Sequence, residues 1–184
     1  VTDLRYVNHK IYKGKPELPG LPALYLNSDD EADTLEVVAY DKVTDVFVTL
    51  IYTVFNGYSA ITRSVKVENR SNRPVELETV HSLCVDLPSG DFEMFDLYGK
   101  WGKERSLQRY PLHHGIQSIR SKRGSSSHFH NPFTALVTKN ATETYGECYG
   151  FNLIYSSNFS IDAEVDIYSC TRLVMGINPE TFCW

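Results

Sequence analysis

The ten residues Val46–Phe55, VFVTLIYTVF, decide the fold class, because β-branched and aromatic side chains fill most of the run. The dipeptide Asn56-Gly57 follows, which favours a tight turn between two strands. Ile61, Arg63, Val65 and Val67 then alternate with polar side chains, the pattern of a strand with one wet face. The sequence therefore predicts a β-hairpin. Since its first strand is apolar on both faces, we expect that strand to be covered on both sides, as in the middle of a layered sandwich.

Further strand-like segments occur on both sides of this hairpin. They are residues 34–40, 75–87, 92–98, 115–119, 151–155, 159–167 and 171–176, and the chain also opens with a strand-like segment. Turn signals separate them at residues 72–74, 88–90, 131–132 and 178–179. The acidic residues 29–34 have the composition of a helical turn, but nothing amphipathic continues it. We predict an all-β fold of mostly antiparallel strands with little helix.

Length and composition restrict the classes of protein to which the chain can belong. Its 184 residues, 42% of them hydrophobic, have the makeup of an ordinary globular domain. A complete (β/α)₈ barrel needs about 250 residues. The formal net charge of −5 disfavours general binding to DNA or RNA. No apolar run reaches the roughly 18 residues that cross a bilayer. We expect no nucleic-acid partner, no membrane partner and no complete barrel enzyme.

The four cysteines, Cys84, Cys148, Cys170 and Cys183, lie among apolar or strand-forming neighbours. None of them belongs to a Cys-x-x-Cys motif, and a chain of this length buries enough core to be stable without disulfides. We therefore predict free thiols, a reducing environment and a cytoplasmic location. An adhesion module of the periplasm or cell surface, the alternative, would pair these cysteines in disulfides.

The stretch of residues 99–133 differs from the rest of the chain in charge. It holds seven Lys or Arg residues and one acid, Glu104, although the whole chain is acidic. Four of the six histidines are also here, and Trp101 stands between two glycines, a setting that favours an exposed indole. Loops of this chemistry commonly contact a ligand or another protein surface. A stand-alone carbohydrate-binding β-sandwich, with Trp101 stacked on a sugar, is one function that these residues suggest.

The sequence contains no complete catalytic or metal-binding motif. Glycosidic hydrolysis needs two carboxylates, but the acidic clusters at residues 29–33 and 86–96 have the pattern of solvated turns or strand edges. His128 and His130 are spaced to share one strand face, as metal ligands on a strand do, but hydrogen bonds to loop carbonyls are the simpler interpretation. We predict no catalytic residue, no metal and no cofactor in this chain.

Many segments resemble the N-terminal domain of glycoside hydrolase family 36 α-galactosidases of the melibiase type. The most specific is residues 123–133, which carry the pattern Arg-Gly-x-Ser-Ser-His-x-x-Asn-Pro-Phe. The similarity extends over nearly the whole chain, in residues 4–9, 11–16, 20–23, 29–35, 52–55, 61–64, 101–105, 115–118 and 176–179.

The resemblance implies a β-supersandwich that precedes a (β/α)₈ catalytic barrel and helps to assemble a tetramer. Such enzymes hydrolyse terminal α-galactosyl residues of melibiose and raffinose-type sugars with retention, using two aspartates of the barrel and no metal. The nucleophile follows a Lys-x-Asp pattern, and no lysine of this sequence has an aspartate two positions later. The family's Gly-Asp-Phe-Arg segment is also missing. We therefore expect residues 1–184 to be a supersandwich domain truncated at both ends, with the barrel outside this chain.

The role implied for such a domain is structural. It would shape the mouth of the substrate pocket and pack against the barrel and neighbouring subunits. The residues that we predict for this substrate-binding or domain-interface surface lie in the basic stretch, and they are Trp101, Arg105, Arg123, His128 and Asn131.

Overall fold

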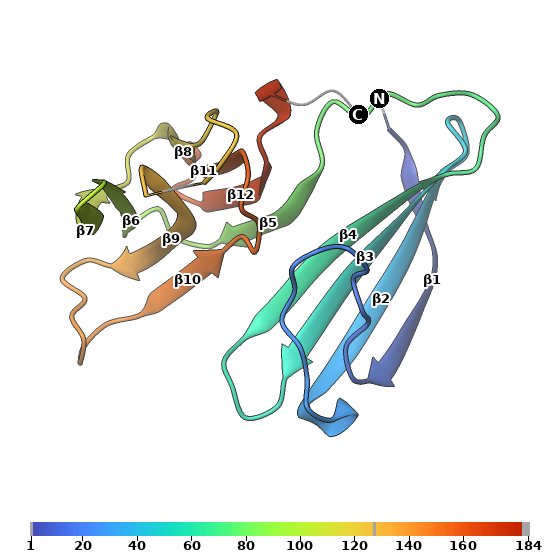
Figure 1. The fold of residues 1–184 in the computed structure, drawn as a ribbon, viewed down its shortest axis with the longest axis horizontal. Helices are drawn as coiled ribbons and strands as arrows, with labels where there is room; N and C mark the ends of the chain where they lie inside the picture. Colours follow the sequence, from blue (N-terminus) through green and yellow to red (C-terminus); the bar gives the residue numbers. More distant parts are fainter. Residues whose placement is uncertain (1, 127, 182–184) are drawn as a thin grey trace. The chain divides into compact units, whose positions relative to one another are not determined.

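The computed structural model describes residues 2–126 and 128–181 and divides the chain into two compact units, residues 2–78 (unit 1) and residues 79–181 (unit 2) (Figure 1). Strands dominate both units. Helical structure in the described residues is limited to two short 3₁₀ turns, η1 (Asp29–Glu31) and η2 (Pro179–Thr181). The prediction of an all-β fold with mostly antiparallel strands and little helix is confirmed.

Unit 1 is a four-stranded antiparallel sheet in which neighbours in sequence are neighbours in space (Figure 1). Its strands are β1 (Leu4–Lys13), β2 (Ala32–Asp41), β3 (Val46–Phe55) and β4 (Ile61–Asn69). The hairpin predicted around Asn56-Gly57 is confirmed, since β3 and β4 pair from Val54 opposite Ile61 onwards without a register shift. The turn expected near residue 29 is also present, as η1.

The two faces of the unit 1 sheet differ in polarity. The register places Val37, Leu50 and Val65 in one row on one face, whereas the next row, on the opposite face, has Ile51 between Glu36 and Ser64. Most side chains of β3, Leu50 among them, are only half buried. The expectation that β3 is covered on both sides is therefore not met in the described residues. The physical reason is that unit 1 has one sheet and no second sheet of its own.

Unit 2 is a sandwich built from two antiparallel sheets, with strand orders β10-β9-β6-β7 and β11-β12-β5. Its strands are β5 (His81–Leu87), β6 (Phe92–Lys100), β7 (Lys103–Pro111), β8 (Gly115–Arg120), β9 (His130–Thr138), β10 (Cys148–Asn152), β11 (Phe159–Val165) and β12 (Thr171–Ile177). β8 runs beside β11, where the N–H of Ser121 donates to the carbonyl oxygen of Phe159 at 3.0 Å.

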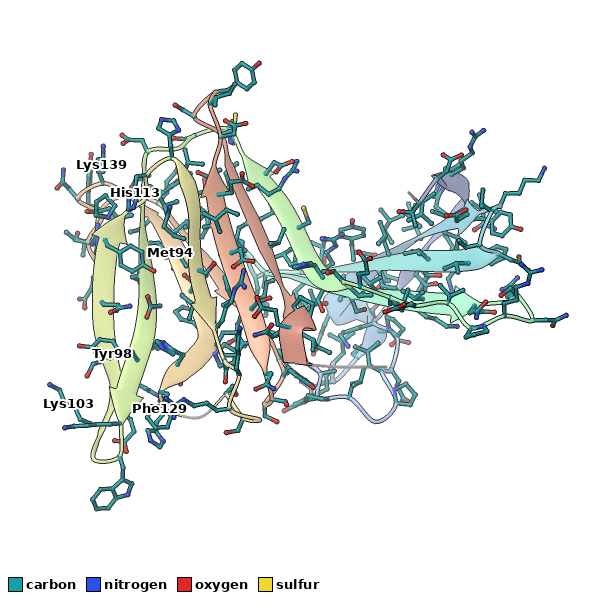
Figure 2. All side chains as sticks on the ribbon, turned by 90° about the horizontal axis from the view of Figure 1, so that it is seen from above. Met94, Tyr98, Lys103, His113, Phe129 and Lys139 are labelled. Atoms are coloured by element: carbon teal, nitrogen blue, oxygen red, sulfur yellow. The ribbon has the colours of Figure 1, made fainter. Side chains whose placement is uncertain are left out.

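The core of unit 2 lies between its two sheets. Met94 and Leu136 point into it from one sheet, and Phe159, Ile161 and Leu173 from the other, and all five side chains are fully buried. Figure 2 shows Met94 in this interior position on β6. In β5, β11 and β12 every second residue supplies the core, which is the alternation that a two-layered sheet requires.

Several strand boundaries differ from those predicted. β5 begins at His81 rather than at residue 75, and β10 covers Cys148–Asn152 rather than residues 151–155. β7 and β9 were not predicted as strands. β7 is rich in charged residues, and Pro132 in β9 has the signature of a turn. The sheet accommodates Pro132 because the β6–β9 register shifts between the pairs Asp96–Thr134 and Tyr98–His130, so this proline lies in a bulge.

Cys148 and Cys170 are free thiols, and Cys183 lies outside the described residues, as does Ser127 of the resemblance segment. In the part of the chain that the structure describes, no helix has the length and hydrophobicity needed to cross a bilayer.

Candidate functional site

The β6–β7 hairpin carries the first part of the predicted contact surface. Its strands pair regularly up to Tyr98–Ser106, and the register then shifts so that Gly99 faces both Glu104 and Arg105. This is a β-bulge, and Arg105 adopts a positive φ of 53° in it. A Cβ atom at Gly99 would lie 2.5 Å from the carbonyl oxygen of Lys103, so no other residue fits without a shift of the backbone.

Trp101 stands at the tip of this hairpin with 88% of its surface exposed. Gly102 next to it has a φ of +75°, which a glycine adopts without strain. The carboxylate of Glu104 accepts a hydrogen bond of 2.7 Å from the N–H of Gly102, and this bond holds the pKa of Glu104 below its usual range. The tip is therefore a fixed turn that presents an indole, with Lys103 beside it (Figure 2).

The loop between β8 and β9 carries the second part of the predicted contact surface. In this loop Phe129 contacts both Arg123 and His128. The guanidinium of Arg123 lies 4.1 Å from the centroid of the Phe129 ring, and the ring of His128 lies 4.7 Å from it. The carbonyl oxygen of Phe129 accepts a hydrogen bond of 3.3 Å from the N–H of Gly99. The loop is therefore attached to the β6–β7 hairpin at the glycine that forms the bulge.

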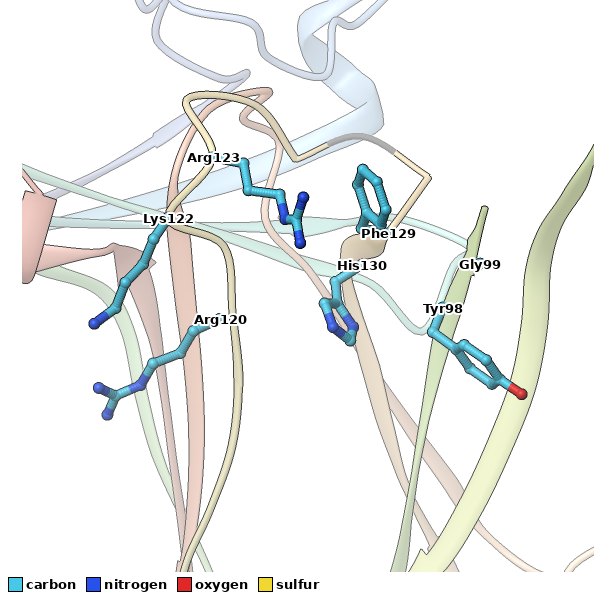
Figure 3. Close-up of a pocket in the computed structure, with 7 residues that line it drawn as sticks. All are labelled: Tyr98, Gly99, Arg120, Lys122, Arg123, Phe129 and His130. Atoms are coloured by element: carbon cyan, nitrogen blue, oxygen red, sulfur yellow. The ribbon is translucent and has the colours of Figure 1, made fainter. Parts of the chain in front are cut away.

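A recess of about 510 Å³ opens between these two segments (Figure 3). The residues that line it are Tyr98, Gly99, Arg120, Lys122, Arg123, Phe129 and His130. In Figure 3, the side chain of Arg123 points towards Phe129 and His130, whereas Arg120 and Lys122 extend in the opposite direction.

The cations of the recess have different partners. Arg120 contacts both oxygens of Asp162, at 3.1 and 3.0 Å, and lies 2.7 Å from Glu180. Lys122 also pairs with Glu180, and this hydrogen bond, with the charges of Lys122 and Arg120, keeps the pKa of Glu180 below its usual range. In residues 2–126 and 128–181, Arg123 forms no ion pair with a carboxylate. Its guanidinium donors thus face the recess without a negative partner.

Four of the five predicted site residues lie in these two segments, and the fifth, Asn131, lies in β9. Trp101 and Arg105 are on the hairpin, Arg123 and His128 both contact Phe129, and Asn131 is the second residue of β9, half buried. Arg123 is the one of the five that lines the recess.

Sequence reasoning missed the residues that hold the segments together. Phe129 lies between two histidines in the sequence, and nothing in that pattern predicts its contacts. Gly99 was interpreted as a neighbour of the exposed Trp101, and its place in a β-bulge was not predicted. His128 and His130 do not share a strand face, because His128 lies before β9 begins. Among the described residues, no group of three His, Cys, Asp or Glu side chains is arranged to hold a metal ion.

This arrangement offers side chains that suit non-covalent contact. Arg123, Phe129 and Trp101 offer a cation, an aromatic face and an exposed indole, which suit a carboxylate, a sugar ring or an apolar protein surface.

Comparison with known proteins shows the family of the chain over its full length. The model of the glycosyl hydrolase family 36 N-terminal domain matches residues 1–184. The chain belongs to this family. The domain is 49% identical, over all of its 184 residues, to α-galactosidase AgaA of Geobacillus stearothermophilus, and it covers 25% of that protein. A probable α-galactosidase C of Aspergillus oryzae is 41% identical over the same 184 residues, and the domain covers 24% of it.

Solved structures share the fold of the domain. The crystal structure of AgaA superposes on all of this chain with a TM-score of 0.97, and the chain covers 26% of it. The α-galactosidase of Lactobacillus brevis, 39% identical, superposes on all of this chain with a TM-score of 0.96, and the chain covers 25% of it. The family 36 domain described here therefore spans about a quarter of the length of these relatives.

Proposed function

We propose that this chain acts as the non-catalytic N-terminal domain of an α-galactosidase that hydrolyses terminal α-D-galactosyl residues of melibiose and raffinose-type oligosaccharides with retention. The observation that carries the proposal is the match of the whole chain to the family 36 N-terminal domain, together with 49% identity to AgaA. Variants of AgaA have been solved in complex with stachyose and with raffinose, which are substrates of the proposed class.

The domain contributes contacts rather than catalytic groups in this proposal. Trp101, Arg105, Arg123, His128 and Asn131 form a surface that packs against the catalytic barrel or a neighbouring subunit, at the mouth of the pocket. The partners are therefore the barrel and the other subunits of a homotetramer, in the cytoplasm. The exposed indole at the hairpin tip and the guanidinium of Arg123, which has no carboxylate partner among the described residues, support this role, because Trp and Arg are enriched at interfaces and a carboxylate of the partner could pair with Arg123.

The activity is tested on the longest natural polypeptide that contains residues 1–184. It should release galactose from melibiose, raffinose and stachyose, and proton NMR of the first product should show the α-anomer, as retention demands. The chain of residues 1–184, assayed in parallel, should release none. A full-length protein that cleaves none of the three sugars, or that releases β-galactose, would refute the proposal.

The contact surface is tested with Trp101→Ala and Arg123→Ala in the full-length protein. Each should lower the mass of the assembly in analytical ultracentrifugation or raise the Michaelis constant for raffinose, because both side chains are placed at an interface or pocket mouth. Arg5→Ala is the matched control, since Arg5 is an exposed arginine on β1 that pairs with Asp3. Unchanged mass and kinetics in both site variants would remove the contact role.

The alternative, a stand-alone carbohydrate-binding β-sandwich, rests on the exposure of Trp101. In that case the isolated chain binds galactosides, and its tryptophan fluorescence changes with a saturable dependence on sugar concentration. A flat titration, in a sample that is folded by circular dichroism, contradicts it.

A further inference from the structure

The turn between β3 and β4 contains a site at which the chain can modify itself covalently. We propose that Asn56 and Gly57 cyclise to a succinimide, through which Asn56 is converted to aspartate and isoaspartate. The inference is independent of the proposed function, because it depends on the geometry of one turn of unit 1.

The reaction consumes water and releases ammonia. The backbone nitrogen of Gly57 loses its proton and attacks Cγ of Asn56, and the new C–N bond closes a five-membered ring. The bond between Cγ and Nδ2 breaks, and the Nδ2 group takes up one proton, equivalent to the one lost by Gly57, and leaves as ammonia. Water then opens the ring at one of its two carbonyl carbons. Opening at Cγ gives aspartate, and opening at the backbone carbonyl carbon gives isoaspartate, in which the chain runs through Cγ.

The nucleophilic nitrogen of Gly57 is accessible. Gly57 has a φ of +80°, and a Cβ atom built on it would meet nothing within 4 Å. Among the hydrogen bonds of the described residues, the neighbouring N–H groups of Asn56 and Tyr58 donate to the carbonyl oxygens of Glu31, at 2.8 Å, and Phe55, at 3.5 Å, whereas that of Gly57 does not donate. Gly57 is thus exposed, and among the described residues no hydrogen bond holds the attacking nitrogen.

Most other asparagines of the chain lack this feature. The N–H groups that follow Asn69, Asn140 and Asn152 donate to backbone carbonyl oxygens, at 3.0, 3.0 and 2.9 Å. Asn131 and Asn178 precede prolines, which have no N–H to lose. The structure therefore distinguishes Asn56 from these five asparagines, beyond the small size of the residue that follows it.

Conversion of Asn56 would break a link inside unit 1. Its Nδ2 donates a hydrogen bond of 2.8 Å to the carbonyl oxygen of Asp30, which ties the β3–β4 turn to η1. A carboxylate at position 56 cannot donate, and it adds a negative charge beside the three acids of η1. Isoaspartate also lengthens the backbone of a turn that joins two strands in regular register. We expect the segment of residues 14–31 to become more accessible once Asn56 has reacted.

The experiment is a time course on the folded chain at neutral and at alkaline pH, followed by peptide mapping that separates aspartate from isoaspartate. The peptide with Asn56 should gain about 1 Da, and faster at the higher pH, because the nucleophile is the deprotonated nitrogen. Loss of Asn56 should exceed that of Asn140 by at least about tenfold, because Asn140 is followed by an alanine whose N–H must first leave its hydrogen bond.

Two variants sharpen the result. Asn56→Gln keeps an amide but requires a larger ring, so the mass gain at this peptide should stop. Asn56→Asp mimics one product, and limited proteolysis should cut its residues 14–31 faster than those of fresh wild type. The proposal is overturned if Asn56 stays intact while Asn27 or Asn140 converts, or if the wild-type rate does not rise with pH. It is also overturned if Asn56→Gln gains mass at the wild-type rate.

Discussion

Unit 1 and unit 2 are both built from antiparallel strands, but they bury their side chains to different degrees. In unit 2, two sheets enclose fully buried side chains such as Met94, Phe159 and Ile161. In unit 1, the central strand β3 is mostly half buried, and no second sheet of that unit covers it. Strand pairing alone gives little stability to a small sheet in water, because it is the burial of a hydrophobic face that supplies most of the free energy. Stability should therefore be unequally divided between the two units.

The largest difference in unfolding free energy is expected between two leucine-to-alanine substitutions, one in each unit. Leu136→Ala removes a fully buried side chain from the core of unit 2, which should cost about 2–5 kcal/mol of unfolding free energy. Leu50→Ala makes the same chemical change in β3, where the side chain is half buried, so roughly half of that loss is expected. Denaturant unfolding, followed by hydrogen exchange that resolves β9 from β3, measures both.

An equal cost for the two leucines would break the comparison, because it would mean that Leu50 is as deeply packed in solution as Leu136. Exchange should also show which amides respond. Those of β6 and β9 should lose protection in Leu136→Ala, and those of β2 and β4 in Leu50→Ala.

The next largest difference in stability is expected between alanine substitutions at two glycines of the β6–β7 hairpin. A Cβ atom at Gly99 would lie within 3.1 Å of backbone atoms of Lys103, Glu104 and His128, so Gly99→Ala should cost about 3 kcal/mol and detach the hairpin from the β8–β9 loop. Gly102→Ala meets no neighbouring atom, and its positive φ should cost about 1 kcal/mol. Thermal unfolding of both variants measures the difference, and a smaller loss for Gly99→Ala would show that the bulge relaxes.

The fold class could be predicted because several strands have a composition and alternation typical of β-structure. Val46–Phe55 is so rich in β-branched and aromatic residues that both strand boundaries and the following turn agree with the structure. β7 and β9 could not be predicted in this way. β7 is an edge strand whose outward side chains are charged, and the proline of β9 is tolerated by a bulge that depends on pairing with β6. That pairing joins residues more than thirty positions apart, which local patterns do not encode.

The candidate surface was predicted in composition but not in geometry. Charge and glycine content indicated the region of residues 99–133, and the family pattern indicated Arg123 and His128. That these two side chains share Phe129, and that its carbonyl oxygen binds Gly99, depends on the meeting of two loops. The sequence shows which side chains are present in these two segments. Their contacts depend on the register of the strands that flank each segment.

A similar aromatic cluster occurs in each unit and allows a smaller test. Phe129 of unit 2 contacts Arg123, and Phe47 of unit 1 contacts Arg70 at 4.0 Å and stacks on Tyr40. Replacement of either phenylalanine by leucine should cost about 1 kcal/mol, since cation–π and ring contacts are lost while most apolar area is kept. Phe47→Leu acts on regular paired strands, whereas Phe129→Leu acts on a loop. We therefore expect enhanced proteolysis of residues 121–129 in Phe129→Leu alone, and loop cleavage at the wild-type rate would contradict the anchoring role.

The smallest expected effect is a dependence on pH at the edge of the recess. The hydrogen bond from Lys122, with the nearby charges, lowers the pKa of Glu180 below the usual 4.5, so the ionised carboxylate is bound more favourably in the folded state. Its stabilisation is present above pH 4.5 and is lost as the pH falls through the lower folded-state pKa. Glu180→Gln should therefore melt slightly below wild type at neutral pH, and the two melting temperatures should converge in acid.

High salt should reduce the same difference, because these side chains are largely exposed and their charges are screened. Unit 1 supplies the comparison in Glu68, whose pKa is lowered chiefly by a hydrogen bond from Arg70. Glu68→Gln should follow the same dependence on pH and salt without altering the recess. A melting difference for Glu180→Gln that persists undiminished in acid would show that the residue acts through the packing of η2 rather than through its charge.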